Sequence, residues 1–131
     1  MAQRIVYQGQ KFTISFAREQ NGACPSADFF DELSQLDKAK LMALFVIAGE
    51  HANFHNREKF GDLGGGMFEF KSGQIRMPFA YAKNDRRLIL ITHGFVKKKD
   101  RAPQKEIARA WRIYNEDQAY TKLAIIRKAK T

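Results

Sequence analysis

The densest group of basic side chains is the run Lys-Lys-Lys-Asp-Arg at residues 97–101. It directly follows His-Gly-Phe at 93–95, which we expect to end a β-strand. Several cationic groups at a strand end can bind the phosphates of a polyanion. A charged, solvated loop is the alternative, and the run alone is a signal of only moderate specificity.

A second candidate group lies on the expected strand 74–82, where bulky apolar side chains alternate with smaller ones. The face without the bulky residues carries Arg76, and we expect an open cleft over it. Lys71, on the adjoining strand, lies within reach of the same area. An arginine and a lysine on a shallow sheet face can bind a phosphodiester and stabilise the charge that develops when a bond breaks. The alternative is structural, with Arg76 pairing with Glu69 across the hairpin.

His93 is the histidine best placed for acid–base chemistry, because imidazole titrates near neutral pH and basic residues lie beside it. A structural role is the alternative. His51 and His55 have a spacing that can hold a metal on one helix, but no third ligand is evident and we expect no metal site. Cys24 has no basic neighbour that would activate it.

A basic stripe is expected on the helix that begins near Pro103. Lys105, Arg109 and Arg112 follow one another at i, i+4 and i+7, which places them on one helix face. Together with the run at 97–101 they predict a continuous cationic surface. A solvated helix face is the alternative.

The composition is that of one small folded domain. The chain has 131 residues and a mass of 15.1 kDa, 44% of its residues are hydrophobic, and its single cysteine excludes an internal disulfide. The apolar run at 41–49 is too short to span a membrane, and residues 1–11 have no signal-peptide core, so we expect a cytoplasmic protein.

The net charge of +9 is unevenly distributed. Residues 1–70 carry 7 basic and 9 acidic side chains, whereas residues 71–131 carry 16 basic and 5 acidic ones. A field of this size favours nucleic acid or another polyanion as the partner, with a merely solubilising surface as the alternative.

These groups must be positioned by an α+β domain with a mainly antiparallel sheet. We expect one or two strands within 3–17, and a helix from about 26 that is capped by Ser26. A second helix from about Asp37 completes a helical hairpin. A flexible loop at 56–66, strands at 67–71, 74–82 and 86–95, the helix from Pro103 and a further helical stretch at 117–128 follow.

Three segments resemble a known family. They are Phe-Glu-Phe-Lys at 68–71 with Gln-Ile-Arg at 74–76, the run from Ile-Leu-Ile-Thr to His-Gly-Phe-Val-Lys-Lys at 89–98, and Ala-Pro-Gln-Lys-Glu-Ile-Ala-Arg-Ala at 102–110. They are similar to the RelE/ParE toxin superfamily, in particular its HigB-like, phage-derived branch of type II toxin–antitoxin toxins. The resemblance covers about residues 27–115. It departs from the family at Lys71, where arginine is usual, and at Ile75, where tyrosine is frequent.

The resemblance implies one RelE-like domain over residues 1–131, with a strand extension at about 1–11 and a helical tail at about 116–131. It further implies an endoribonuclease that cuts mRNA, usually on the ribosome, and so arrests translation. Such enzymes need no metal and no cofactor: the RNA 2′-hydroxyl attacks the adjacent phosphate while basic side chains stabilise charge and move protons. A cognate antitoxin, often a helix-turn-helix protein, holds the toxin inactive.

The resemblance assigns the catalytic and RNA-binding roles to basic residues. For catalysis they are Lys71, Arg76, His93, Lys97 and Lys98. For contacts with the RNA backbone they are Lys99, Arg101, Lys105, Arg109 and Arg112. Two alternatives remain open, a ParE-like inhibitor that binds DNA gyrase without catalysis and a phage-encoded basic nucleic-acid-binding module.

Overall fold

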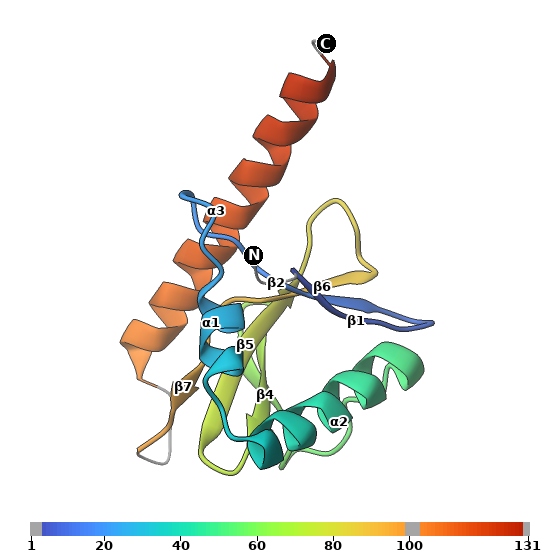
Figure 1. Ribbon diagram of the computed structural model, residues 1–131, viewed down its shortest axis with the longest axis vertical. Helices are drawn as coiled ribbons and strands as arrows, with labels where there is room; N and C mark the ends of the chain where they lie inside the picture. The colour runs from blue at the N-terminus through green and yellow to red at the C-terminus, as the bar shows by residue number, and fades with distance from the viewer. Residues whose placement is uncertain (1–3, 99–102, 130–131) are drawn as a thin grey trace.

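A single mixed sheet carries two helices on one face and the long C-terminal helix on the other (Figure 1). The computed structural model describes residues 4–98 and 103–129. The helices are α1 (Pro25–Asp31), α2 (Gln35–His51) and α3 (Gln104–Ala129). The strands are β1 (Ile5–Gln8), β2 (Thr13–Phe16), β3 (Phe60–Gly64), β4 (Met67–Ser72), β5 (Ile75–Tyr81), β6 (Leu88–Ile91) and β7 (Phe95–Val96).

The strand order is β1-β2-β6-β5-β4-β3, and β7 pairs with β5. The β2–β6 pair is parallel and the remaining pairs are antiparallel. This arrangement confirms the expected α+β class with a mainly antiparallel sheet. Within the ranges described above, no helix combines the length and hydropathy that a bilayer crossing requires.

Both faces of the sheet are apolar over much of their area. On one face Phe70 and Phe79 pack with Phe45 of α2. On the other, Ala80 packs with Ile113 of α3. Because successive strand residues point to opposite faces, this two-sided burial explains why β5 is apolar at almost every position. The face that we expected to be open is therefore covered by α3 over part of its length.

The two helices of the hairpin begin at other residues than expected. Cys24, not Ser26, is the N-cap of α1, and Pro25 is its first residue. Ser26 is buried and its hydroxyl donates to the Ile91 carbonyl at 2.9 Å, so the side chain is used in tertiary packing. In α2 the cap is Ser34, whose hydroxyl accepts a hydrogen bond from the Asp37 backbone N–H at 3.1 Å.

Two other expectations were wrong. The polar segment at 56–66 is not all loop, because Phe60–Gly64 pairs with β4 as the edge strand β3. The expected strand at 86–95 is two strands, since β6 pairs with β5 at residues 79–81 and β7 pairs with it at residues 75–76. Gly94 lies in the break, where a Cβ atom would overlap the ring of Phe29.

The two expected C-terminal helical stretches form one continuous helix of 26 residues. Asp117, at the expected boundary, is 1% exposed. It accepts hydrogen bonds from the Arg4 side chain and the Arg18 backbone N–H, which ties α3 to the N-terminal strands. The polar residue therefore marks a buried contact of the helix and not its end.

Candidate functional site

Charged side chains meet on the α3 side of the sheet, beyond the area that α3 covers. Lys71 of β4 lies directly opposite Arg76 of β5, and Arg76 is paired on its other side with Phe95 of β7. Glu69, two residues before Lys71 on β4, points to the same face. The predicted pair Lys71 and Arg76 is thus brought together by the β4–β5 hairpin.

Glu69 is a buried carboxylate in this group. It is only 6% exposed, and its Oε1 has no hydrogen-bond partner among the described residues. Burial raises its pKa, while the positive charges of Arg76, Lys71 and Lys97 act in the opposite direction. The result is a carboxyl group with increased proton affinity beside three cations.

The neighbouring strand makes room for this carboxylate. Gly61 of β3 is the cross-strand partner of Glu69. A Cβ atom at Gly61 would come within 2.9 Å of Glu69 Oε2. The absence of a side chain at Gly61 therefore leaves room for the Glu69 carboxylate.

Arg76 is held by its own turn and not by the carboxylate. Its Nη1 donates to the carbonyls of Gly73 at 2.7 Å and of Ile75 at 3.0 Å. Its Nε is buried without a partner among the described residues. In that same part of the chain the ion pair with Glu69, our structural alternative, is not formed. These two hydrogen bonds orient the guanidinium of Arg76, and its other N–H groups can still donate to a ligand.

The lysine run begins at the margin of this group. The backbone N–H of Lys97 donates to the Gln74 carbonyl at 2.7 Å, which extends the β5–β7 pairing, and its ammonium charge acts on Glu69. Lys98 is exposed. Lys99 and Arg101, both predicted RNA contacts, lie outside the described residues.

His93 is buried, with 1% of its surface exposed. Its ring stacks on Phe95, and Nδ1 lies 3.0 Å from the Thr92 hydroxyl. Nε2 lies 3.4 Å from Glu106 Oε1 of α3. Because Phe95 flanks Arg76, His93 supports the strand that borders the charged group. Its burial favours the structural alternative over direct proton transfer.

Protonation of His93 should destabilise the fold. Burial, assisted by the charges of Arg109 and Arg112, lowers its pKa from 6.5 to about 4. Since the pKa is lower in the folded state, the stability it contributes is present above about pH 6.5 and is lost as the pH falls toward 4. We expect the free energy of unfolding to fall by at most roughly 3 kcal/mol over this window through His93.

Urea unfolding of the wild type and His93→Gln across this pH window measures that contribution. The pH dependence should be flatter in His93→Gln, while His55→Gln, which changes an exposed histidine, should follow the wild type. Parallel pH curves for the wild type and His93→Gln would contradict the assignment.

The basic stripe of α3 is only partly free. Lys105 and Arg109 are exposed. Arg112 pairs with Glu19 at 3.0 Å and with Glu116 at 2.9 Å. Because its guanidinium already pairs with these two carboxylates, Arg112 is a weaker candidate for a phosphate contact than the sequence indicated.

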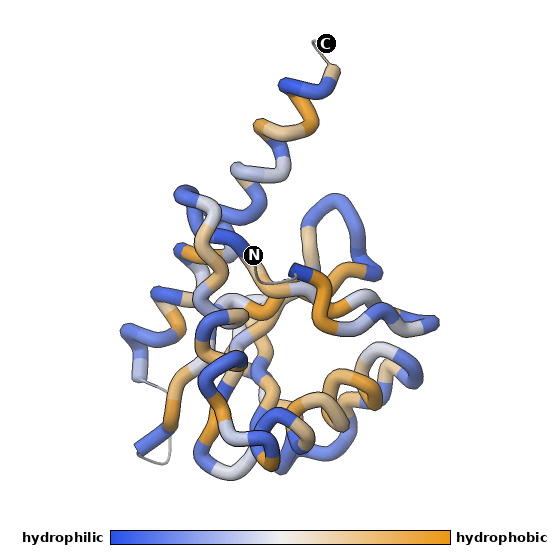
Figure 2. The backbone as a smooth tube through the Cα atoms, in the orientation of Figure 1, coloured by the Kyte–Doolittle hydropathy of each residue, from blue (hydrophilic) through white to orange (hydrophobic). Residues whose placement is uncertain are grey.

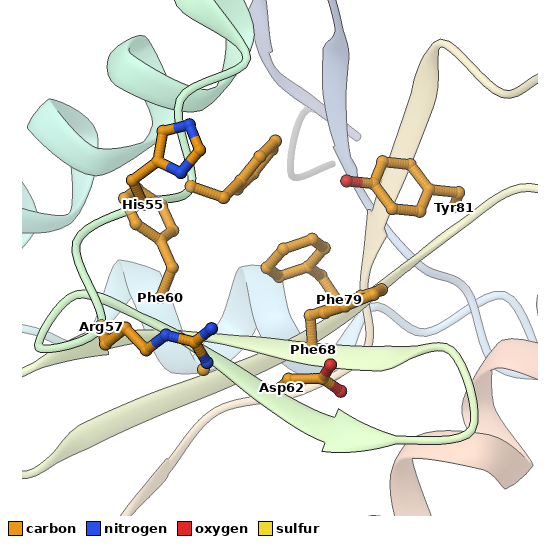
Figure 3. A pocket seen from close by; sticks show the side chains of 9 residues that line it. His55, Arg57, Phe60, Asp62, Phe68, Phe79 and Tyr81 are labelled. Carbon is orange, nitrogen blue, oxygen red and sulfur yellow. The ribbon is translucent and has the colours of Figure 1, made fainter.

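A separate pocket of about 270 Å³ opens on the opposite face of the sheet (Figure 3). Its walls are rings such as Phe68, Phe79 and Tyr81, and His55 and Arg57 reach it from the segment after α2. Phe68 precedes Glu69 on β4 and packs on the other face, so the ring-lined part of this pocket lies across the sheet from the charged group.

No metal centre forms within residues 4–98 and 103–129, where no three histidine, cysteine or carboxylate side chains come together. His51 and His55 also do not lie on one helix, as their spacing had indicated. α2 ends at His51, and Ala52 has a positive φ of 52°, which turns the chain away before His55.

Glu69 is the functional candidate that the sequence analysis missed. We had considered it only as a structural partner for Arg76. One signal was available: a glutamate in the apolar strand Met-Phe-Glu-Phe at 67–70, on the same face as Lys71. Its burial depends on β3, which the sequence did not predict.

Comparison with known proteins identifies a relationship for most of the chain. A family model described as phage derived protein Gp49-like (DUF891) matches residues 28–115. The matched region contains the end of α1, all of α2, the strands from β3 to β7 and the first half of α3. No curated protein matches the chain significantly.

Proposed function

The chain belongs to the Gp49-like family of phage-derived proteins, and from this premise we propose that it is the toxin of a type II toxin–antitoxin module. As its activity we propose metal-independent cleavage of mRNA, which arrests translation. The observation that carries this proposal is the buried Glu69 carboxylate beside Lys71, Arg76 and Lys97. This group combines a proton acceptor with cations that suit a phosphodiester.

In the proposed reaction the Glu69 carboxylate removes the proton from an RNA 2′-hydroxyl. The 2′ oxygen attacks the adjacent phosphorus, and the bond from phosphorus to the 5′ oxygen of the next nucleotide breaks. The products are a 2′,3′-cyclic phosphate and a 5′ oxygen that takes a proton from the ammonium group of Lys97 or Lys98. A base with a raised pKa suits this step because it accepts the proton more strongly than an ordinary carboxylate does.

The cations act on the phosphate. Arg76, oriented by the Gly73 and Ile75 carbonyls, and Lys71 opposite it would hold the non-bridging oxygens and stabilise their developing charge. His93 would position Phe95 and thereby β7. Lys105 and Arg109 are exposed on α3 and would bind the RNA backbone beyond the scissile phosphate.

Controlled induction in bacteria with mapping of new mRNA 5′ ends tests this function. The wild type should arrest growth and produce discrete new ends in translated messages, and Arg76→Ala should do neither. Arg86→Ala, which changes an exposed arginine at the other end of the hairpin, is the matched control and should behave as the wild type.

Two results would contradict the ribonuclease proposal. Growth arrest with DNA damage and without new mRNA ends would favour a gyrase inhibitor of the ParE type. No arrest at all would favour a nucleic-acid-binding module without catalysis. In both cases Arg76→Ala would give no specific loss of RNA cleavage.

A further inference from the structure

The C-terminal end of α3 projects beyond the sheet (Figure 1), and every side chain from Lys122 to Ala129 is exposed. Large apolar residues nevertheless occur there. Leu123 is 53% exposed, Ile125 58% and Ile126 41%. Figure 2 shows both hydrophobic and hydrophilic stretches along the projecting end. Exposed apolar residues grouped on one element mark an interaction surface.

Helical geometry places two of these residues on the side of α3 that faces away from the body. Ile113 and Asp117 are buried and define the side that faces the sheet. At about 100° per residue, Leu123 lies about 120° and Ile126 about 180° from Asp117. α3 therefore presents an apolar stripe that its own domain cannot cover.

Basic side chains border this stripe on both sides. By the same rotation, Lys122 lies next to Ile126 on one side and Arg127 lies next to Leu123 on the other. This is the arrangement of a helix-pairing seam, with an apolar centre and charged flanks that select the partner. We define Leu123 and Ile126, flanked by Lys122 and Arg127, as the tail stripe.

We propose that the tail stripe docks an acidic amphipathic helix of a partner protein. Such a helix would cover Leu123 and Ile126 with its apolar residues and place carboxylates against Lys122 and Arg127. A second copy of the chain fits less well, because pairing two tail stripes would bring their basic flanks together. The inference does not depend on the proposed ribonuclease activity.

The proposal also accounts for a helix that extends past its tertiary support. Short helical segments without packing are marginal in water, because most helical stability in proteins comes from burying an apolar face. A partner helix on the tail stripe would supply this burial for the last turns of α3.

Fluorescence anisotropy with labelled synthetic peptides tests the surface on the full chain. The probe is a helical peptide with leucine along one seam and glutamate at the flanking positions. Two controls are a scrambled peptide of the same composition and a peptide with lysine in place of glutamate. The wild type should bind the acidic probe and bind both controls at least about tenfold more weakly.

Matched variants locate the binding. L123S/I126S should weaken binding of the acidic probe at least about tenfold. Leu36→Ser is the control, because Leu36 is 64% exposed on α2 and lies away from the tail stripe. Its affinity for the probe should equal that of the wild type. Circular dichroism of each variant checks that the helix content is unchanged.

Several results would overturn the proposal. These are no binding of the acidic probe by the wild type, equal binding of the scrambled or lysine peptide, or equal loss in L123S/I126S and Leu36→Ser. A dimer in sedimentation that L123S/I126S abolishes would make a second copy the occupant. Binding to phosphatidylserine vesicles that the same variant abolishes, without peptide binding, would make a membrane surface the occupant.

Discussion

Replacing Glu69 by glutamine is expected to reduce RNA cleavage strongly while making the protein more stable above the raised pKa of this carboxyl group. The substitution keeps the shape of the side chain but removes the proton acceptor. General-base catalysis contributes typically 10²–10⁴-fold, and we expect a loss of about that size in the cleavage rate. Single-turnover cleavage of an mRNA, on ribosomes if these are required, measures the effect.

The stability change follows from the pKa of Glu69. Its pKa in the folded state is raised from 4.5, chiefly by burial. A carboxyl group whose folded pKa is raised favours folding below its unfolded pKa, and this contribution is lost as the pH rises through the folded pKa. Above the folded pKa the buried charge is therefore unfavourable, and Glu69→Gln should raise the free energy of unfolding there.

The pH dependence of the cleavage rate tests whether Glu69 acts as the base. In the wild type the cleavage rate should rise with pH through the raised pKa of Glu69, because the base must be ionised. Glu69→Gln should remove this limb. Glu58→Gln, which changes an exposed glutamate just before β3, is the control and should keep both rate and pH profile. Wild-type cleavage by Glu69→Gln would remove Glu69 from the mechanism.

Replacing Arg76 by alanine is expected to lower the cleavage rate by about 10²–10³-fold, the usual effect of removing one preorganised donor at a developing charge. The fold should persist, because the Arg76 side chain bonds only to carbonyls of its own turn among the described residues. Arg76→Lys should recover part of the rate, since an ammonium keeps the charge but lacks the planar fork of the guanidinium.

Substrate affinity distinguishes catalysis from simple binding. Arg76→Ala should reduce the single-turnover rate at saturating RNA. Lys105→Ala should mainly weaken RNA binding, and the affinity of this variant should depend less on salt than that of the wild type. If Arg76→Ala changed only the affinity, Arg76 would be a backbone contact and not a catalytic residue.

Local sequence patterns were sufficient for the main elements. The apolar spacing in α2 and the alternation in β4 and β5 are properties of neighbouring residues, and they predicted the helix and the hairpin. The exact pairing was not predictable, because the expected strands 67–71 and 74–82 leave a turn at 72–73 and would place Arg76 opposite Glu69. In the structure the turn is at 73–74, since Ser72 pairs with Ile75, and this one-residue shift brings Arg76 opposite Lys71.

The remaining features depend on segments that are distant in the sequence. β3 is a strand because it pairs with β4, although its own residues are polar and glycine-rich. The division between β6 and β7 is fixed by their separate pairing with β5 and by the ring of Phe29 against Gly94. Propensity carries no information about such contacts, so the tertiary structure overrode it here.

The sequence by itself determined the α+β class, the concentration of positive charge in the second half and the basic residues that flank the β4–β5 hairpin. Only the tertiary structure decided which of these groups could do chemistry. It buried His93 under Phe95, paired Arg112 with two carboxylates and enclosed Glu69 beside Gly61. The physical reason is that burial and partner charges set the pKa of a group, and both arise from long-range packing.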